Sequence, residues 1–184
     1  MTAASENNKR IAKNTIFLYV RMVFVMGVTL FTSRVVLDKL GVVDYGLYNS
    51  VSGVVAMLMF LNGTLSTGTS RFLTFELGRN DVSRLKATFS TTFYTHLILA
   101  LLVALFMESV GLWFVYEKLI IPSERLSAAL WAYHISIFTA VIAITQVPYT
   151  SVIIAHENMK VYAYLGVFEA VAKLVIVYLL IISS

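Results

Sequence analysis

Six ionisable side chains lie inside long apolar runs of this 184-residue chain. Their types and spacing could serve to bind an anion or to contact a substrate or a proton. A charge at the centre of a bilayer costs about 2.5–3.5 kcal/mol on insertion scales. Such residues are therefore expected to face a protein interior or a wet cavity, or to extend back to the membrane surface. They are Arg21, Arg34, His96, His134, Glu169 and Lys173.

Three of these residues are bases that outnumber the single acid, so a cavity lined by them would attract an anion. Arg21 lies about 9 Å inside its apolar run, and either a cavity position or an extension to the surface fits it equally. Arg34 has Asp38 one turn later, which favours a local pair or an extension to the surface. Glu169 and Lys173 are four residues apart in the favourable order, as a self-neutralising pair or as a contact for substrate or proton.

The remaining polar positions favour packing over catalysis. Hydroxyl side chains crowd the run before His96, where they can return hydrogen bonds to their own helix or line a hydrated cavity. His134 is expected to be a hydrogen-bonded packing residue, with a proton relay as the alternative. The chain has no cysteine, and it shows no metal spacing, nucleophile–base set or phosphate loop. The sequence therefore predicts neither an enzyme nor a cofactor or metal site.

The elements that must position these residues are membrane-spanning helices. Hydrophobic residues make up 59% of the chain and charged residues 13%, and mean hydropathy is +0.82. A soluble surface needs about twice that charge. Crossing about 30 Å of hydrocarbon takes roughly 20 helical residues. We expect an all-α polytopic bundle in one membrane domain, residues 1–184, with spans at about 15–37, 47–69, 89–110, 128–147 and 161–182.

Breaker residues separate the predicted spans. Gly41 and the turn Asp44–Gly46 should divide the first two spans, and Pro148 should end the fourth. Asp81 is the expected N-cap of the third helix. Because only two serines follow the last span, we expect the chain to be a piece of a longer transporter.

Basic residues in the connections favour one orientation. Eight lie before the first, third and fifth predicted spans, against three in the other connections. The three are Lys39, Lys118 and Arg125. The positive-inside rule then places the N-terminus in the cytoplasm and, with five spans, the C-terminus outside. The bases are explained as topology signals, so nucleic acid is not an expected partner.

Four stretches, spread over most of the chain, resemble the N-terminal part of bacterial polysaccharide flippases of the MOP superfamily (Wzx-type, with lipopolysaccharide-biosynthesis members). Residues 8–15 are similar to the short basic start of these proteins, and 33–49 to their signature of a base, Leu-Gly and Tyr-Gly. Residues 62–72 resemble the Gly-rich end of the second helix with its closing Arg, and 146–159 the connection before the fifth. The ordered set, rather than any single motif, carries the resemblance.

The resemblance implies a MATE-like fold of about twelve to fourteen helices in two lobes. It also implies movement of lipid-pyrophosphate-linked oligosaccharide from the cytoplasmic to the outer leaflet of the bacterial inner membrane by alternating access. Expected partners are membrane lipid, this glycolipid and glycan-assembly proteins. Arg21, Arg34 and Lys173 would contact the anionic headgroup, because an Arg fork matches phosphate oxygens, and Glu169 would set the charge or protonation of Lys173.

Two rival functions stay open at this point. A cation-coupled multidrug exporter of the same superfamily usually places an acid in an early helix. Here the acids Asp38 and Glu108 lie near outer ends, and only Glu169 favours that rival. A membrane component that does not transport anything is the other rival.

Overall fold

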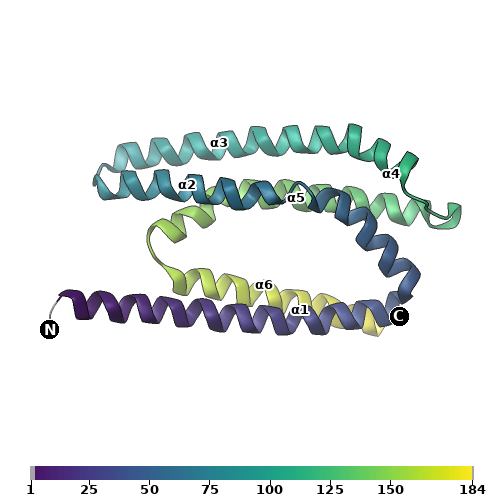
Figure 1. Ribbon diagram of the computed structural model, residues 1–184, viewed down its shortest axis with the longest axis horizontal. Coiled ribbons are helices and arrows are strands. Elements are labelled where there is room, and N and C mark those ends of the chain that lie inside the picture. The colour runs from purple at the N-terminus through teal and green to yellow at the C-terminus, as the bar shows by residue number, and fades with distance from the viewer. Residues whose placement is uncertain (1–2, 184) are drawn as a thin grey trace. The chain divides into compact units, whose positions relative to one another are not determined.

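The chain folds into α-helices, and no strand occurs among residues 3–183, the part that this computed structural model describes (Figure 1). A helix satisfies every backbone polar group within its own segment, which is what long apolar runs require in hydrocarbon. The all-α helix-bundle class is thereby confirmed. The elements are α1 Ala3–Ala56, α2 Phe60–Gly78, α3 Val82–Phe106, the π-turn Met107–Gly111, α4 Leu112–Lys118, the 3₁₀ turn Ser123–Arg125, α5 Leu126–Ala155 and α6 Met159–Ser183.

Among the described residues, four helical stretches are long and apolar enough to cross a membrane, so the chain is a membrane protein. They are Asn8–Ala56, Val82–Lys118, Ser123–Ala155 and Met159–Ile182. Four of the five predicted spans lie inside these stretches.

The predicted span 47–69 does not form one continuous helix. Its first part ends α1 and its second part begins α2, with a turn at 57–59 between them. There the backbone tightens to three-residue hydrogen bonds, from the amide of Leu58 to the carbonyl of Val55 (3.1 Å) and from Met59 to Ala56 (3.0 Å). After the split α2 still has 19 residues, but it is not among the four stretches that are apolar enough to cross a membrane.

The chain forms two compact units, each described by itself. Unit 1 contains α1 as far as Val42, together with the chain from His156 onward, and unit 2 contains Val43–Ala155. Gly41 lies at the junction with φ 74° and ψ 169°, a conformation that interrupts α1 and that favours glycine. Whether the two units make one membrane domain stays a prediction.

Unit 1 is a parallel pair of helices, α1 and α6, lying side by side (Figure 1). Residues later in α1 contact residues later in α6, as expected for two helices that run in the same direction. Arg10 and Asn14 contact Glu157, Arg21 contacts Tyr162, and farther along Phe31 lines an apolar groove with residues 174–181 of α6.

Unit 2 is built from three rods. The first is the bent stretch 43–78, the second comprises α3, the π-turn and α4, and the third is α5. The bent stretch runs parallel to α5, because Ser52 hydrogen-bonds Ser136 (3.1 Å) and Ser151 donates to the carbonyl of Ser66 (3.4 Å). The second rod runs antiparallel to both, joined to them by the short connections 79–81 and 119–122.

Three local predictions have different outcomes. Asp81 is the N-cap of α3, and its carboxylate accepts from the Arg84 amide at 3.1 Å, as predicted. The predicted turn Asp44–Gly46 is wrong, because these residues are helical. Within α1 the helix is interrupted at Gly41 instead. The predicted end at Pro148 is also wrong, since α5 continues to Ala155. Pro148 is fully buried, and packing by neighbouring helices lets a helix continue through proline.

Candidate functional site

Arg21 occupies a position in the packing seam between α1 and α6. On α1 the less exposed residues recur every three or four positions, at 14, 17, 21, 25, 28 and 32. On α6 they include the small residues Ala163, Gly166 and Ala170. Spacings of three and four place residues on one helix face, and small residues let two helices approach closely. A charged side chain therefore lies where this pattern calls for an apolar one.

The Arg21 side chain lies over the α6 backbone and an aromatic ring. Its guanidinium carbon is 4.3 Å from the centroid of the Tyr162 ring. A β-carbon added to Gly166 would collide with Arg21 Nε and lie 2.8 Å from Cδ and 2.9 Å from Cζ. The absence of a side chain at Gly166 thus provides the space that Arg21 fills. The ring face partly offsets the loss of water around the cation.

One donor of Arg21 is left without an acceptor. Its Nε is buried and hydrogen-bonds to no group in the part of the chain that the structure describes. No carboxylate of those residues lies within ion-pair distance of it. A buried donor without an acceptor costs about 1–3 kcal/mol, more when it is charged. The Arg21 guanidinium is therefore suited to accept an anion from outside the chain.

The end of unit 1 that carries Arg21 is strongly basic. Between residues 8 and 21 and between 157 and 166 the sequence has five bases against one acid. The acid, Glu157, is held by Arg10 at 3.1 Å. The five bases are Lys9, Arg10, Lys13, Arg21 and Lys160. This end presents a net positive charge around the unpaired guanidinium nitrogen.

The other predicted site residues are not gathered around Arg21. Arg34, Glu169 and Lys173 are all exposed. Among the described residues no ion pair joins Glu169 to Lys173 or Arg34 to Asp38, so neither of the local pairs considered above forms. Exposed pairs contribute at most about 1 kcal/mol and cost side-chain entropy, which gives a physical reason for their absence. Their role as headgroup contacts stays a prediction.

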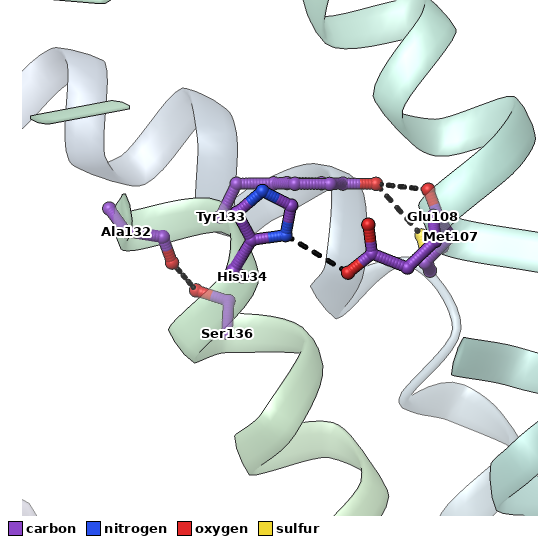
Figure 2. A network of polar contacts seen from close by, with 6 residues as sticks. All are labelled: Met107, Glu108, Ala132, Tyr133, His134 and Ser136. Carbon is purple, nitrogen blue, oxygen red and sulfur yellow. Dashed lines mark hydrogen bonds and ion pairs between the residues drawn. The ribbon is translucent and has the colours of Figure 1, made fainter. Parts of the chain in front are cut away.

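A polar network in unit 2 joins the π-turn to α5 (Figure 2). His134 Nδ1 lies 2.9 Å from Glu108 Oε1, and the hydroxyl of the buried Tyr133 donates to the carbonyl of Met107 at 2.7 Å. A β-carbon on Gly111 would collide with the Tyr133 hydroxyl and lie 2.8 Å from the sulfur of Met107. The π-turn is thus fitted around Tyr133 and needs glycine at position 111.

Sequence reasoning treated Glu108 and His134 separately and missed their pairing. His134, though not Glu108, lines a groove of about 500 Å³ together with residues that include Ser127 and Trp131. A signal was present, because Glu108 and His134 lie eleven and twelve residues from the two ends of the connection 119–122. Antiparallel helices bring residues equally distant from their connection to the same level.

The hydroxyl-rich half of α3 behaves as a structural segment. Thr92 donates to the carbonyls of Thr88 and Phe89 (both 2.9 Å), and Thr95 donates to that of Thr91 (2.8 Å). These bonds stay within the helix, as one of the two sequence hypotheses expects. Among the described residues there is no group of three or more His, Cys, Asp or Glu side chains that could hold a metal ion.

Arg21, Tyr162 and Gly166 together form the candidate site that the geometry supports best, a cation in a helix seam whose buried Nε has no acceptor among the described residues. Comparison with known proteins adds no relative to this description. No family model, no curated protein and no solved structure matches the chain.

Proposed function

We propose that the chain takes part in moving a lipid-pyrophosphate-linked oligosaccharide across the bacterial inner membrane, with Arg21 binding the anionic headgroup. The observation that carries the proposal is the Arg21 guanidinium, held against Tyr162 and Gly166 with a buried Nε that lacks an acceptor. Phosphate oxygens match the donor fork of arginine, and a diphosphate carries the charge that this basic end lacks. The sequence resemblance to polysaccharide flippases supplies the oligosaccharide.

The depth of Arg21 supports recognition of a headgroup. Its contacts, Tyr162 and Gly166, are the fourth and eighth residues of α6. At 1.5 Å per residue they lie about 5–10 Å from the start of that helix. A lipid phosphate at the boundary between headgroups and hydrocarbon would lie at a similar depth, whereas a group at the bilayer centre would be farther in.

The parallel packing of α1 and α6 supports five crossings. If both helices cross the membrane, an odd number of crossings must lie between them, because they run in the same direction. The three rods of unit 2 supply that number when the bent stretch 43–78 crosses as a whole. With the basic end of unit 1 in the cytoplasm, the N-terminus is inside and the C-terminus outside, as the sequence predicts.

Binding of a lipid diphosphate to the purified chain tests the proposal. The chain is placed in nanodiscs of phosphatidylcholine, and a polyprenyl diphosphate is added as probe while native mass spectrometry counts bound lipid. We expect Arg21→Gln to weaken binding about 10-fold or more, since a hydrogen bond to a charged group contributes about 1.5–3 kcal/mol. Transfer of a fluorescent glycolipid diphosphate between leaflets of proteoliposomes should fall in parallel.

Arg79→Gln is the matched control. Arg79 is exposed in the connection before α3, on the same predicted side of the membrane, and should not change binding. Equal binding by wild type and Arg21→Gln would overturn the proposal. Equal affinity for the diphosphate and for phosphatidylglycerol would instead mean that the basic end attracts any anionic lipid, which would also overturn it. Preference for a cationic dye over both lipids would favour the exporter.

A further inference from the structure

The chain passes between its two units at two places, and a residue with positive φ lies at each of them. It leaves unit 1 after residue 42 and enters it again at residue 156. Beside these points Gly41 has φ 74° and Glu157 has φ 53°. Asn80, which lies within unit 2, is the one other residue of the described chain with positive φ. Left-handed backbone interrupts an α-helix, so both passages are breaks between helices.

The first joint is narrow, because the chain is held again soon after Gly41. The helix resumes beyond Gly41, and Asp44 in its first turn forms an ion pair with Arg125, so that both residues belong to unit 2. A β-carbon added to Gly41 would meet nothing within 4 Å. Glycine is therefore suited to this position by its backbone conformation and not by crowding. Rotation at this joint is confined to the few residues around Gly41.

The second joint is equally narrow, and here the held side belongs to unit 1. Arg10 forms an ion pair with the Glu157 carboxylate at 3.1 Å, and the Asn14 side chain donates to the Glu157 carbonyl at 3.3 Å. On the other side Ala155, the last residue of α5, is buried. The connection between α5 and α6 consists of residues 156–158. Hinges in proteins are typically a few residues at the ends of elements, as at both of these joints.

The two joints lie at opposite ends of unit 1 (Figure 1). Asn14 contacts Glu157 and so marks the level of the second joint on α1, and Gly41 follows Asn14 by 27 residues. At 1.5 Å per residue the joints are about 40 Å apart along α1. A body attached at two separated points can turn about the line through them, but it cannot tilt without displacing a joint. That line runs along the α1–α6 pair.

We propose that the α1–α6 pair swings as a rigid body about this line, with Gly41 and residues 156–158 as its hinges. Both helices contain stretches that can cross a membrane, so the axis crosses the membrane and the swing moves the pair sideways within it. Every side chain of unit 1 then keeps its depth. A tilt would instead change the depth of the charged residues Arg34, Glu169 and Lys173, and charge is costly toward the bilayer centre.

Distances between paired spin labels, measured by pulsed EPR on the full chain in nanodiscs, test the swing. The chain has no cysteine, so labelled cysteines can be introduced in pairs without removing a native one. Met22 with Ile176 reports within unit 1, Val82 with Phe138 within unit 2, and Phe138 with Ile176 between the units. All four side chains are exposed. We expect a broad or two-peaked distance distribution between the units and narrow distributions within each.

Two hinge variants change the joints in different ways. Gly41→Ala disfavours positive φ and should shift the distribution between the units. Glu157→Gly allows both signs of φ and removes the carboxylate that Arg10 holds, so it should broaden that distribution. Gly46→Ala is the matched control and should leave it unchanged, because this glycine is helical, lies within unit 2 and has nothing within 4 Å of an added β-carbon.

A distribution between the units as narrow as those within them would overturn the proposal. A distribution that is unchanged in both hinge variants, while their distances within each unit show that they fold, would overturn it as well. Collisions of the Ile176 label with oxygen measure its depth, and we expect the same depth in wild type and in both variants. A changed depth would mean that unit 1 tilts, which contradicts the proposed axis. No lipid diphosphate is present, so the result stands or falls apart from the proposed function.

Discussion

The Arg21 site in unit 1 and the buried side chains of His96 and Asn62 in unit 2 leave opposite kinds of group unsatisfied. Arg21 offers a buried donor on a permanent cation. His96 and Asn62 each carry a buried acceptor instead, since His96 Nδ1 donates to the carbonyl of Thr92 and leaves Nε2 with a lone pair. The first arrangement is suited to an anion, whereas the second lacks a hydrogen-bond donor. The contrast shows that the type of an unsatisfied group, donor or acceptor, indicates better than the burial of that group does which ligand a membrane interior would bind.

The two regions also differ in how freely the polar side chain that lies against a glycine can move. Gly111 faces Tyr133, which is fully buried and hydrogen-bonded to the carbonyl of Met107, whereas Gly166 faces the long and flexible Arg21. An added methyl group should therefore cost stability in unit 2 and function in unit 1.

The largest stability effect is expected for Gly111→Ala. Overpacking against a fixed ring typically costs about 1–3 kcal/mol of unfolding free energy. Thermal unfolding in detergent measures the loss. Gly68→Ala is the control, because its β-carbon meets nothing within 4 Å and alanine favours a helix by about 1 kcal/mol. Equal stability of Gly111→Ala and wild type would mean that the π-turn does not depend on Tyr133.

Gly166→Ala should cost less stability than Gly111→Ala but more anion binding. Arg21 can rotate away from the new methyl group, so we expect a loss of about 1 kcal/mol or less of unfolding free energy, with weaker lipid diphosphate binding. Gly27→Ala on α1 also meets nothing within 4 Å and should bind normally. If Gly166→Ala kept full affinity, the position of Arg21 over α6 would not matter for the anion.

The smallest effect concerns the start of α3, where Asp81 is the N-cap. Hydrogen bonds from the Ser83 side chain and the Arg84 amide lower the pKa of Asp81 below its ordinary value of 3.8. A lowered carboxyl pKa stabilises the folded state above the ordinary value, and this contribution is lost as pH falls through the lowered pKa. Hydrogen exchange of the first-turn amides of α3 should quicken slightly in Asp81→Ala at neutral pH, and the difference should vanish in strong acid. A difference that persisted there would rule out the carboxylate as the cause.

The helices were predictable from the sequence because apolar run length decides what crosses hydrocarbon. The cap at Asp81 was predictable for a similar reason, since its donor lies three residues away. The split of 47–69 was not, because Met57–Met59 contain no breaker residue. The sequence wrongly predicted that a helix ends at Pro148, since whether a proline ends a helix depends on the neighbouring helices that bury it.

The candidate site was only partly predictable. The sequence singles out Arg21 as a base inside an apolar run, with a cavity position and an extension to the surface equally open. It gives no sign that Tyr162 and Gly166, about 140 residues later, receive it.

The central claim is that the Arg21 guanidinium contacts the phosphorus-bearing headgroup of a lipid diphosphate. Solid-state NMR can measure it directly, as dipolar dephasing of arginine Cζ by ³¹P in nanodiscs containing a polyprenyl diphosphate. The account predicts dephasing in wild type that disappears in Arg21→Gln and persists in Arg79→Gln. Dephasing that is the same in wild type and Arg21→Gln, or absent from both, would contradict it.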